Sequence, residues 1–193
     1  MIKVLDNFIP TNRQDDLEQF TMSEFFRWYW NKTTIYNENK RKKWKTKNTI
    51  DTGQFVSNIL GVRTDKQITD YAKELYKGMK TIFKNINFDD TIRVKSNLTT
   101  NKTGYKKTSH QPIHNDMEYK SKKKSIIYYV NDSDGDTIFF DDKLKETKRV
   151  KPKKGRAIIF DSHTLHCGCN PIKNEKRIVI SFIVKNENSI LYR

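Results

Sequence analysis

The second half of the chain alternates short apolar runs with turn signals, and this alternation most constrains the fold. The runs are rich in β-branched and aromatic residues and occupy 91–100, 124–132, 137–142, 155–161 and 176–185. Turn-forming segments such as NDSDGD, PKKG and NPIKNEK separate them. Because no amphipathic helix separates the runs, an antiparallel jelly roll or sandwich is predicted. The last run is apolar on both faces, as is typical of a strand covered on both sides.

The first half predicts a strand and two helices. Residues 1–9 predict a short strand, and residues 12–30 an amphipathic helix that starts after Pro10 and Thr11. Residues 31–54 are polar and basic, which predicts a surface loop. In residues 64–85, apolar side chains recur at steps of three and four, which predicts a second amphipathic helix.

The length of 193 residues fits one domain. We expect residues 1–88 to form a support region of strand and helices. Residues 89–193 are expected to form the β core, with the helices packed on one sheet. The fold class is therefore mainly β, of the α+β type.

The chain is strongly basic, with 38 Lys and Arg against 23 Asp and Glu, a formal net charge of +15. Such a charge attracts polyanions, including nucleic acid. Its lysine-rich runs, at 40–47, 120–124 and 148–156, lack the interleaved aromatic residues of a base-stacking platform. We interpret them first as a solvated surface, with electrostatic contact to nucleic acid as the alternative.

Cys167 and Cys169 are the two cysteines of the chain, and one residue separates them. Such a pair makes a poor structural disulfide, and with one nearby histidine it lacks the fourth ligand of a zinc site. We expect small buried thiols next to that histidine, and these would make the protein sensitive to oxidation. The sequence shows no signal peptide and no membrane-spanning run, so a cytoplasmic protein with no membrane partner is expected.

The segment HND at 114–116 presents an imidazole and a carboxylate on one side of an extended chain, because residues i and i+2 point the same way. A mononuclear non-haem iron site needs a third ligand from a distant strand, and this ligand is commonly a second histidine. His163 and His166 follow the apolar run at 155–161 and are both candidates for this third ligand. His110 has the wrong spacing for the same face and is expected to be a structural residue.

Arg177 opens the last apolar run, and its planar guanidinium suits a carboxylate partner. Lys176, one position earlier, is the alternative cation. Ser181 lies four residues after Arg177, on the same face of the expected strand, and offers a hydroxyl.

These motifs together resemble the Fe(II)/2-oxoglutarate-dependent dioxygenases, especially the prolyl-4-hydroxylase-like branch. The resemblance rests on HND at 114–116, DGDTIFFD at 134–141, KPKKGRAIIFDSHTLHCGCNP at 151–171 and KRIVISF at 176–182. It covers about residues 90–185, and it implies a double-stranded β-helix (jelly roll) core. It also implies the cofactors Fe(II), 2-oxoglutarate and O2, with ascorbate as a candidate reductant.

The resemblance implies a role for each matching residue. His114, Asp116 and His166 would bind the iron, with His166 favoured over His163. Arg177, favoured over Lys176, would bind the distal carboxylate of 2-oxoglutarate. Further cosubstrate contacts are expected from Tyr128, with Tyr129 as the alternative of opposite strand parity, and from Ser181 and Asn97.

The implied reaction oxidises 2-oxoglutarate to succinate and CO2 and hydroxylates a substrate C–H bond. The first expected substrate is a prolyl or other side chain of a protein or peptide, with a small molecule also considered. One alternative is oxidative demethylation of nucleic acid on the same scaffold. Another is a non-catalytic, basic jelly-roll protein that binds nucleic acid. The sequence does not define the oligomeric state.

Overall fold

The computed structural model describes residues 1–35, 38–61, 69–118 and 121–191. Its helices are α1 (Thr11–Met22), α2 (Glu38–Lys43) and α3 (Asp70–Ile82), with two short 3-10 turns at Phe88–Asp90 and Glu187–Ser189. Its strands are β1 (Lys3–Leu5), β2 (Tyr29–Asn31), β3 (Gln54–Leu60), β4 (Thr91–Thr100), β5 (Lys124–Tyr129), β6 (Thr137–Phe140), β7 (Glu146–Val150), β8 (Ala157–Asp161), β9 (Leu165–Gly168) and β10 (Lys176–Val184).

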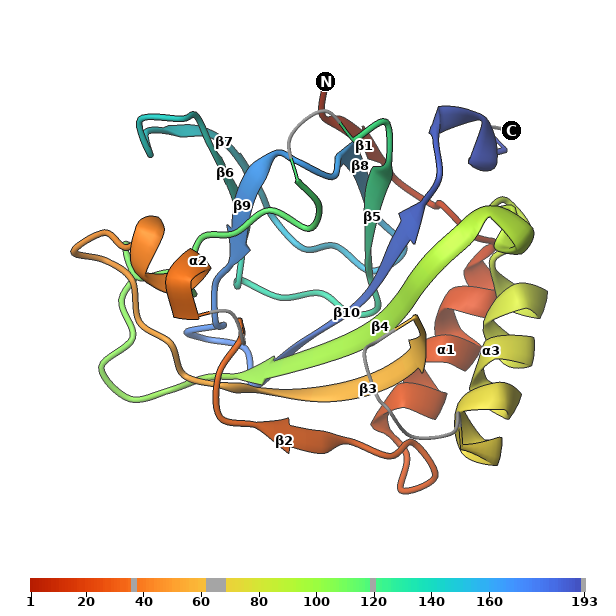
Figure 1. Ribbon diagram of the computed structural model, residues 1–193. Helices are drawn as coiled ribbons and strands as arrows, with labels where there is room; N and C mark the ends of the chain where they lie inside the picture. The colour runs from red at the N-terminus through yellow and green to blue at the C-terminus, as the bar shows by residue number, and fades with distance from the viewer. Residues whose placement is uncertain (36–37, 62–68, 119–120, 192–193) are drawn as a thin grey trace.

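The strands form two antiparallel sheets (Figure 1). The larger sheet has the order β1-β8-β5-β10-β4-β3-β2, and the smaller has the order β7-β6-β9. Strand β10 lies between β5 and β4, so both of its edges are hydrogen-bonded. The predicted antiparallel, β-rich architecture is confirmed. Because β1, β2 and β3 come from the first 88 residues, the support region contributes strands to the main sheet as well as helices.

The larger sheet is buried on both faces, and strand parity decides what each residue contacts. Even-numbered residues of β10, such as Ile180 and Phe182, pack with Leu17 of α1 and Met79 of α3 in the main hydrophobic core. Figure 1 shows these two helices together on one side of the sheet. Odd-numbered residues face the smaller sheet, where Val179 packs with aromatic side chains. This double burial explains why the β10 sequence is apolar at almost every position.

Helix α3 begins where the local chemistry favours a helix start. The Thr69 hydroxyl accepts a hydrogen bond from the backbone N–H of Ala72, which caps the helix. Leu75 and Met79, four residues apart, are buried on the face toward the sheet. The predicted helix is thus confirmed over Asp70–Ile82, whereas residues 64–68 of the prediction, including Ile68, lie outside the described ranges.

Parts of the predicted secondary structure were wrong. The first helix ends at Met22, not at residue 30, because Tyr29–Asn31 pairs with β3 as an edge strand. The predicted loop 31–54 contains the short helix α2. Strands β3, β7 and β9 were not predicted. Within the described ranges, none of the helices combines the length and apolar character needed to cross a lipid bilayer.

Candidate metal centre

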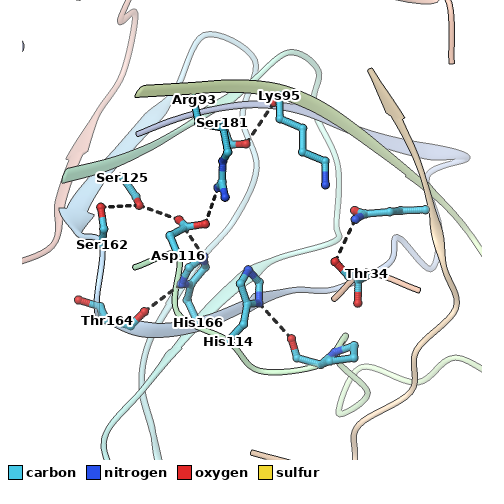
Figure 2. Close-up of polar contacts among 12 residues, drawn as sticks. Thr34, Arg93, Lys95, His114, Asp116, Ser125, Ser162, Thr164, His166 and Ser181 are labelled. Carbon is cyan, nitrogen blue, oxygen red and sulfur yellow. Dashed lines mark hydrogen bonds and ion pairs between the residues drawn. The ribbon is translucent and has the colours of Figure 1, made fainter. Parts of the chain in front are cut away.

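Two histidines and an aspartate converge between the sheets. Candidate ligand atoms of His114, Asp116 and His166 all lie within 4.8 Å of one another. The ring centroids of the two histidines are 4.5 Å apart. The structure therefore brings together the three residues that the resemblance assigned to iron (Figure 2).

Backbone pairing creates this convergence. The N–H of His114 donates to the carbonyl of His166 at 2.9 Å, and the N–H of His166 donates back at 2.8 Å. Asp116 is fixed in the same way, because its N–H donates to the carbonyl of Ser162 at 2.9 Å. The segment that carries the His-x-Asp motif is therefore held against the end of β8 and the start of β9.

Each imidazole is oriented by a hydrogen bond to a backbone carbonyl. His114 Nδ1 lies 3.2 Å from the carbonyl oxygen of Pro112, and His166 Nδ1 lies 3.0 Å from that of Thr164. When Nδ1 carries the proton, Nε2 of each ring keeps its lone pair for a metal, as is usual for histidine ligands. Burial and the neighbouring His166 lower the pKa of His114 to about 3. Burial also lowers the pKa of His166, so both rings are neutral near pH 7.

The carboxylate of Asp116 is only 8% exposed and has two polar partners. Arg93 Nη2 donates to Oδ1 at 2.5 Å, and the Ser125 hydroxyl donates to Oδ2 at 2.6 Å. Burial by itself raises the pKa of Asp116, but Arg93 and the two imidazoles outweigh it and hold the pKa below its usual range. Two neutral imidazoles and an ionised carboxylate form the donor set of a non-haem iron(II) site. The residues present therefore fit such an ion.

The three residues line a cavity of about 320 Å³. The other lining side chains come mainly from the odd-numbered face of the large sheet. They include Arg93, Lys95, Asn97 and Thr99 of β4, Ile127 of β5, and Arg177, Val179 and Ser181 of β10. A volume of this order is typical of a pocket for a small molecule.

Arg177 lies in this cavity and is 6% exposed. Its Nη2 donates to the Thr137 hydroxyl at 2.9 Å, whereas its Nε is buried without a hydrogen-bond partner among the described residues. Gly168 gives the guanidinium room, because a Cβ at that position would lie 3.2 Å from Arg177 Nη1. Lys176 does not line the cavity. As the even-numbered neighbour of Arg177, it lies on the other face of β10.

Ser181 and Asn97 also line the cavity. The Ser181 hydroxyl donates to the backbone carbonyl of Lys95 at 3.1 Å. The amide oxygen of Asn97 is buried without a hydrogen-bond partner within the described part of the chain. An unpaired buried acceptor next to the candidate metal ligands is open to a bound molecule.

Tyr128 lies in the main hydrophobic core and does not line the cavity, so its predicted contact with the cosubstrate was wrong. Its side chain points to the helical face of β5, where its ring packs edge-on against Phe83 at 5.0 Å. Tyr129 has the opposite parity and faces the cavity side, where its hydroxyl donates to Thr137 at 2.6 Å. Because Thr137 also accepts from Arg177, Tyr129 belongs to the hydrogen-bond network behind the guanidinium.

The remaining histidines lie outside the cluster. His110 is buried, and its ring nitrogens contact the Thr46 hydroxyl at 2.9 Å and the Gln111 carbonyl at 2.8 Å. His163 is not part of the three-residue group.

Both thiols beside His166 are buried and free, and burial raises the pKa of Cys167 and of Cys169, to about 11 for Cys169. Because thiolate is the reactive form, a raised pKa lowers the reactivity of these thiols.

Sequence reasoning did not identify Arg93, Lys95 and Ser125 as site residues. Arg93 and Lys95 share the odd parity of Asn97, so the alternation in TIRVKSNLTT was the signal that could have identified them. No comparable signal marks Ser125, since its contact with Asp116 arises from the pairing of distant segments.

Comparison with known proteins agrees with this geometry. Residues 100–185, which contain the three candidate metal ligands and Arg177, match the sequence model of the 2OG-Fe(II) oxygenase superfamily. This part of the chain is therefore similar to that superfamily. Iron(II), 2-oxoglutarate (2OG) and O2 are accordingly the cofactor and cosubstrates of this protein class, and the His-Asp-His cluster is suited to hold the metal. A search of curated protein sequences returned no match.

Solved oxygenase structures show the same fold over nearly the whole chain. A 2OG-Fe(II) oxygenase-family oxidoreductase from Burkholderia pseudomallei has a TM-score of 0.62 at 12% identity, covering 100% of this chain and 88% of that one. A prolyl hydroxylase from Trichoplax adhaerens, solved with a hypoxia-inducible-factor peptide, has a TM-score of 0.59 at 13% identity, covering 97% and 84%. An alpha-ketoglutarate-dependent epimerase of nogalamycin biosynthesis has a TM-score of 0.56 at 8% identity, covering 96% and 78%. The expected double-stranded β-helix core is confirmed.

Proposed function

We propose that this oxygenase-family protein is an Fe(II)- and 2-oxoglutarate-dependent hydroxylase, and that its whole chain acts as one catalytic domain. Its substrate is a C–H bond of a prolyl or other side chain in a protein or peptide. The observation that carries the proposal is the His114–Asp116–His166 cluster, which shares one cavity with the buried cation Arg177. The prolyl preference rests on the fold shared with a prolyl hydroxylase.

In this proposal His114, Asp116 and His166, which line the cavity, would hold the iron. When bound, Fe(II) supplies the activation of O2 that couples oxidation of 2OG to oxidation of the substrate. Ser125 and Arg93 fix the orientation of the Asp116 carboxylate, and the two backbone carbonyls fix the imidazoles. Such outer contacts commonly change metal affinity when they are removed.

Arg177 binds the distal carboxylate of 2OG in this arrangement. A guanidinium suits this task because its planar fork pairs with two carboxylate oxygens at once. Thr137 holds one of its nitrogens, and Tyr129 in turn donates to Thr137, so the fork is oriented before the cosubstrate arrives. Asn97 and Ser181 line the same cavity, and the amide nitrogen of Asn97 can donate to a carboxylate there.

The test is succinate formation from 2OG by purified protein with Fe(II) and ascorbate. The wild-type protein is expected to form succinate slowly without a primary substrate, and His166→Ala is expected to abolish this activity. His163→Ala is the matched control, because His163 lies outside the cluster. Equal activity of the His166 variant and the wild type would overturn the metal assignment.

Product analysis then identifies the substrate class and the type of reaction. A mass increase of one oxygen on a proline-containing peptide supports the hydroxylase proposal. The similar epimerase makes this measurement necessary, since the fold also serves a reaction other than hydroxylation. Net charge is the one observation on this chain that favours nucleic acid, so modification of an oligonucleotide instead of the peptide would contradict the proposal.

A further inference from the structure

Lys95 extends from the odd-numbered face of β4 into the cavity that holds the candidate metal ligands. Figure 2 shows its ammonium group directed toward the space between His114 and Thr34, away from the strand. The described part of the chain gives its Nζ no hydrogen-bond or ion-pair partner. Burial and the nearby Arg93 lower the pKa of Lys95 to about 8, although attraction to the Asp116 carboxylate partly opposes this shift.

The other two cations of the cavity have assigned partners. Arg93 pairs with Asp116. Arg177 contacts Thr137 and, in the proposed function, binds the distal carboxylate of 2OG. Iron(II) and the 2OG dianion carry opposite charges of equal size, so binding both leaves the charge of Lys95 uncompensated. A buried charge without a partner is unfavourable, and a bound anion relieves this cost.

The strand register separates Lys95 from the proposed 2OG anchor. Lys95 is paired with Ser181, whereas Arg177 is paired with Thr99, four residues further along β4. Four residues of a strand span about 13 Å, so the two cations enter the cavity from well-separated positions. Lys95 extends toward Thr34, which also lines the cavity (Figure 2). A second anionic group, separate from the distal carboxylate of 2OG, is therefore needed to reach it.

We propose that Lys95 binds a carboxylate of the primary substrate and so selects substrates with a carboxylate close to the carbon that is oxidised. The inference rests on the proposed function, because it takes the Arg177 end of the cavity as the 2OG site. A single free ammonium matches one negative charge, which favours a carboxylate over a phosphate dianion. The charge of Arg93 is offset by its ion pair with Asp116, which involves Nη2 of the guanidinium.

The experiment uses two probes that differ only in this charge, N-acetyl-L-proline and N-acetyl-L-prolinamide. Their affinities for the wild-type protein loaded with Mn(II) and 2OG are measured by calorimetry without oxygen. The acid is expected to bind about 10-fold more tightly than the amide, the size of effect that one charged hydrogen bond gives. Equal affinities, or no binding of the acid, overturn the proposal.

Variants identify the residue responsible. Lys95→Met is expected to abolish the preference for the acid and to leave 2OG affinity unchanged, whereas Lys95→Arg keeps the preference. Lys102→Met is the matched control, because Lys102 is exposed and follows the same strand outside the cavity lining. Removing an unpaired buried charge does not destabilise the fold, so the Lys95→Met protein can be measured directly.

The 2OG titrations separate the two proposals. If the wild-type protein binds no 2OG, the proposed function fails. If 2OG binds and Lys95→Met weakens its affinity as strongly as Arg177→Met does, Lys95 is a cosubstrate anchor and the substrate carboxylate site is overturned. If 2OG affinity stays unchanged while the preference for the acid is lost, the carboxylate site is supported.

Discussion

The Ser125 hydroxyl donates to Oδ2 of Asp116 at 2.6 Å and is the hydrogen-bond donor from β5 to this carboxylate. The second oxygen, Oδ1, accepts from Arg93 of β4. The candidate metal carboxylate is therefore held between two strands that lie on either side of β10. This contact fixes the direction of the carboxylate before a metal binds.

Ser125→Ala is expected to weaken Mn(II) affinity by about 10- to 100-fold, the usual effect of losing a hydrogen bond to a metal ligand. The measurement is a Mn(II) titration followed by electron paramagnetic resonance of the free ion. Ser96→Ala is the matched control, because Ser96 is a buried serine on the other face of β4 whose hydroxyl has no partner among the described residues. Unchanged affinity in the Ser125 variant would contradict the role of this contact.

Arg177→Met is expected to weaken 2OG binding by at least about 10-fold, since a charged hydrogen-bonded partner of the distal carboxylate is lost. Calorimetry with the Mn(II)-loaded protein measures this affinity. Lys176→Met tests the neighbouring cation and is expected to leave it unchanged. If Lys176→Met weakens 2OG binding and Arg177→Met does not, Lys176 is the anchor instead. Because Arg177 Nε has no partner, the methionine variant is expected to remain folded.

Tyr128→Phe is expected to leave 2OG affinity unchanged, because the ring lies in the helical core. Its hydroxyl is buried without a partner in the described structure, so its removal should leave the free energy of unfolding unchanged or raise it by up to about 1 kcal/mol. Tyr129→Phe loses the hydrogen bond to Thr137 and should lower that free energy by about 1 kcal/mol. Urea unfolding measures both. Weaker 2OG binding in the Tyr128 variant alone would contradict the placement of its side chain.

The metal-free protein is expected to lose stability as the pH falls below about 6.5. The pKa values of His114 and His166 are lower in the folded protein than the usual 6.5. At a pH between the folded and the unfolded pKa of each histidine, the unfolded chain binds more protons than the folded protein. The free energy of unfolding therefore rises with pH and falls on acidification. Urea unfolding from pH 7 to pH 5 measures the slope. The double variant His114→Gln, His166→Gln should show a shallower slope, and an equal slope would contradict the assignment.

Local sequence rules grouped two of the candidate metal ligands and left His163 and His166 as alternatives for the third, and the family resemblance decided between them. Strand parity grouped His114 with Asp116 and indicated a histidine after the apolar run that became β8. The same rule could not place Tyr128, because both faces of β5 are buried and IIYY has no polar face to distinguish them. The orientation of β5 follows from its pairing with β10 and β8, which no local pattern reveals.

The unpredicted elements are short or polar. Strand β9 has four residues, and β7 has the polar sequence ETKRV at the edge of its sheet. Residues 23–30 continue the aromatic pattern of α1, but pairing with β3 gives Tyr29–Asn31 an extended backbone. In these segments tertiary contacts outweigh local preference.

The most direct test of the central claim is the anomalous diffraction of crystals soaked with Mn(II) and 2OG. The account predicts one manganese peak coordinated by Nε2 of His114, Nε2 of His166 and the Asp116 carboxylate. It also predicts electron density for 2OG that extends from this peak to Arg177. Manganese bound elsewhere, or 2OG whose distal carboxylate does not contact Arg177, would contradict it.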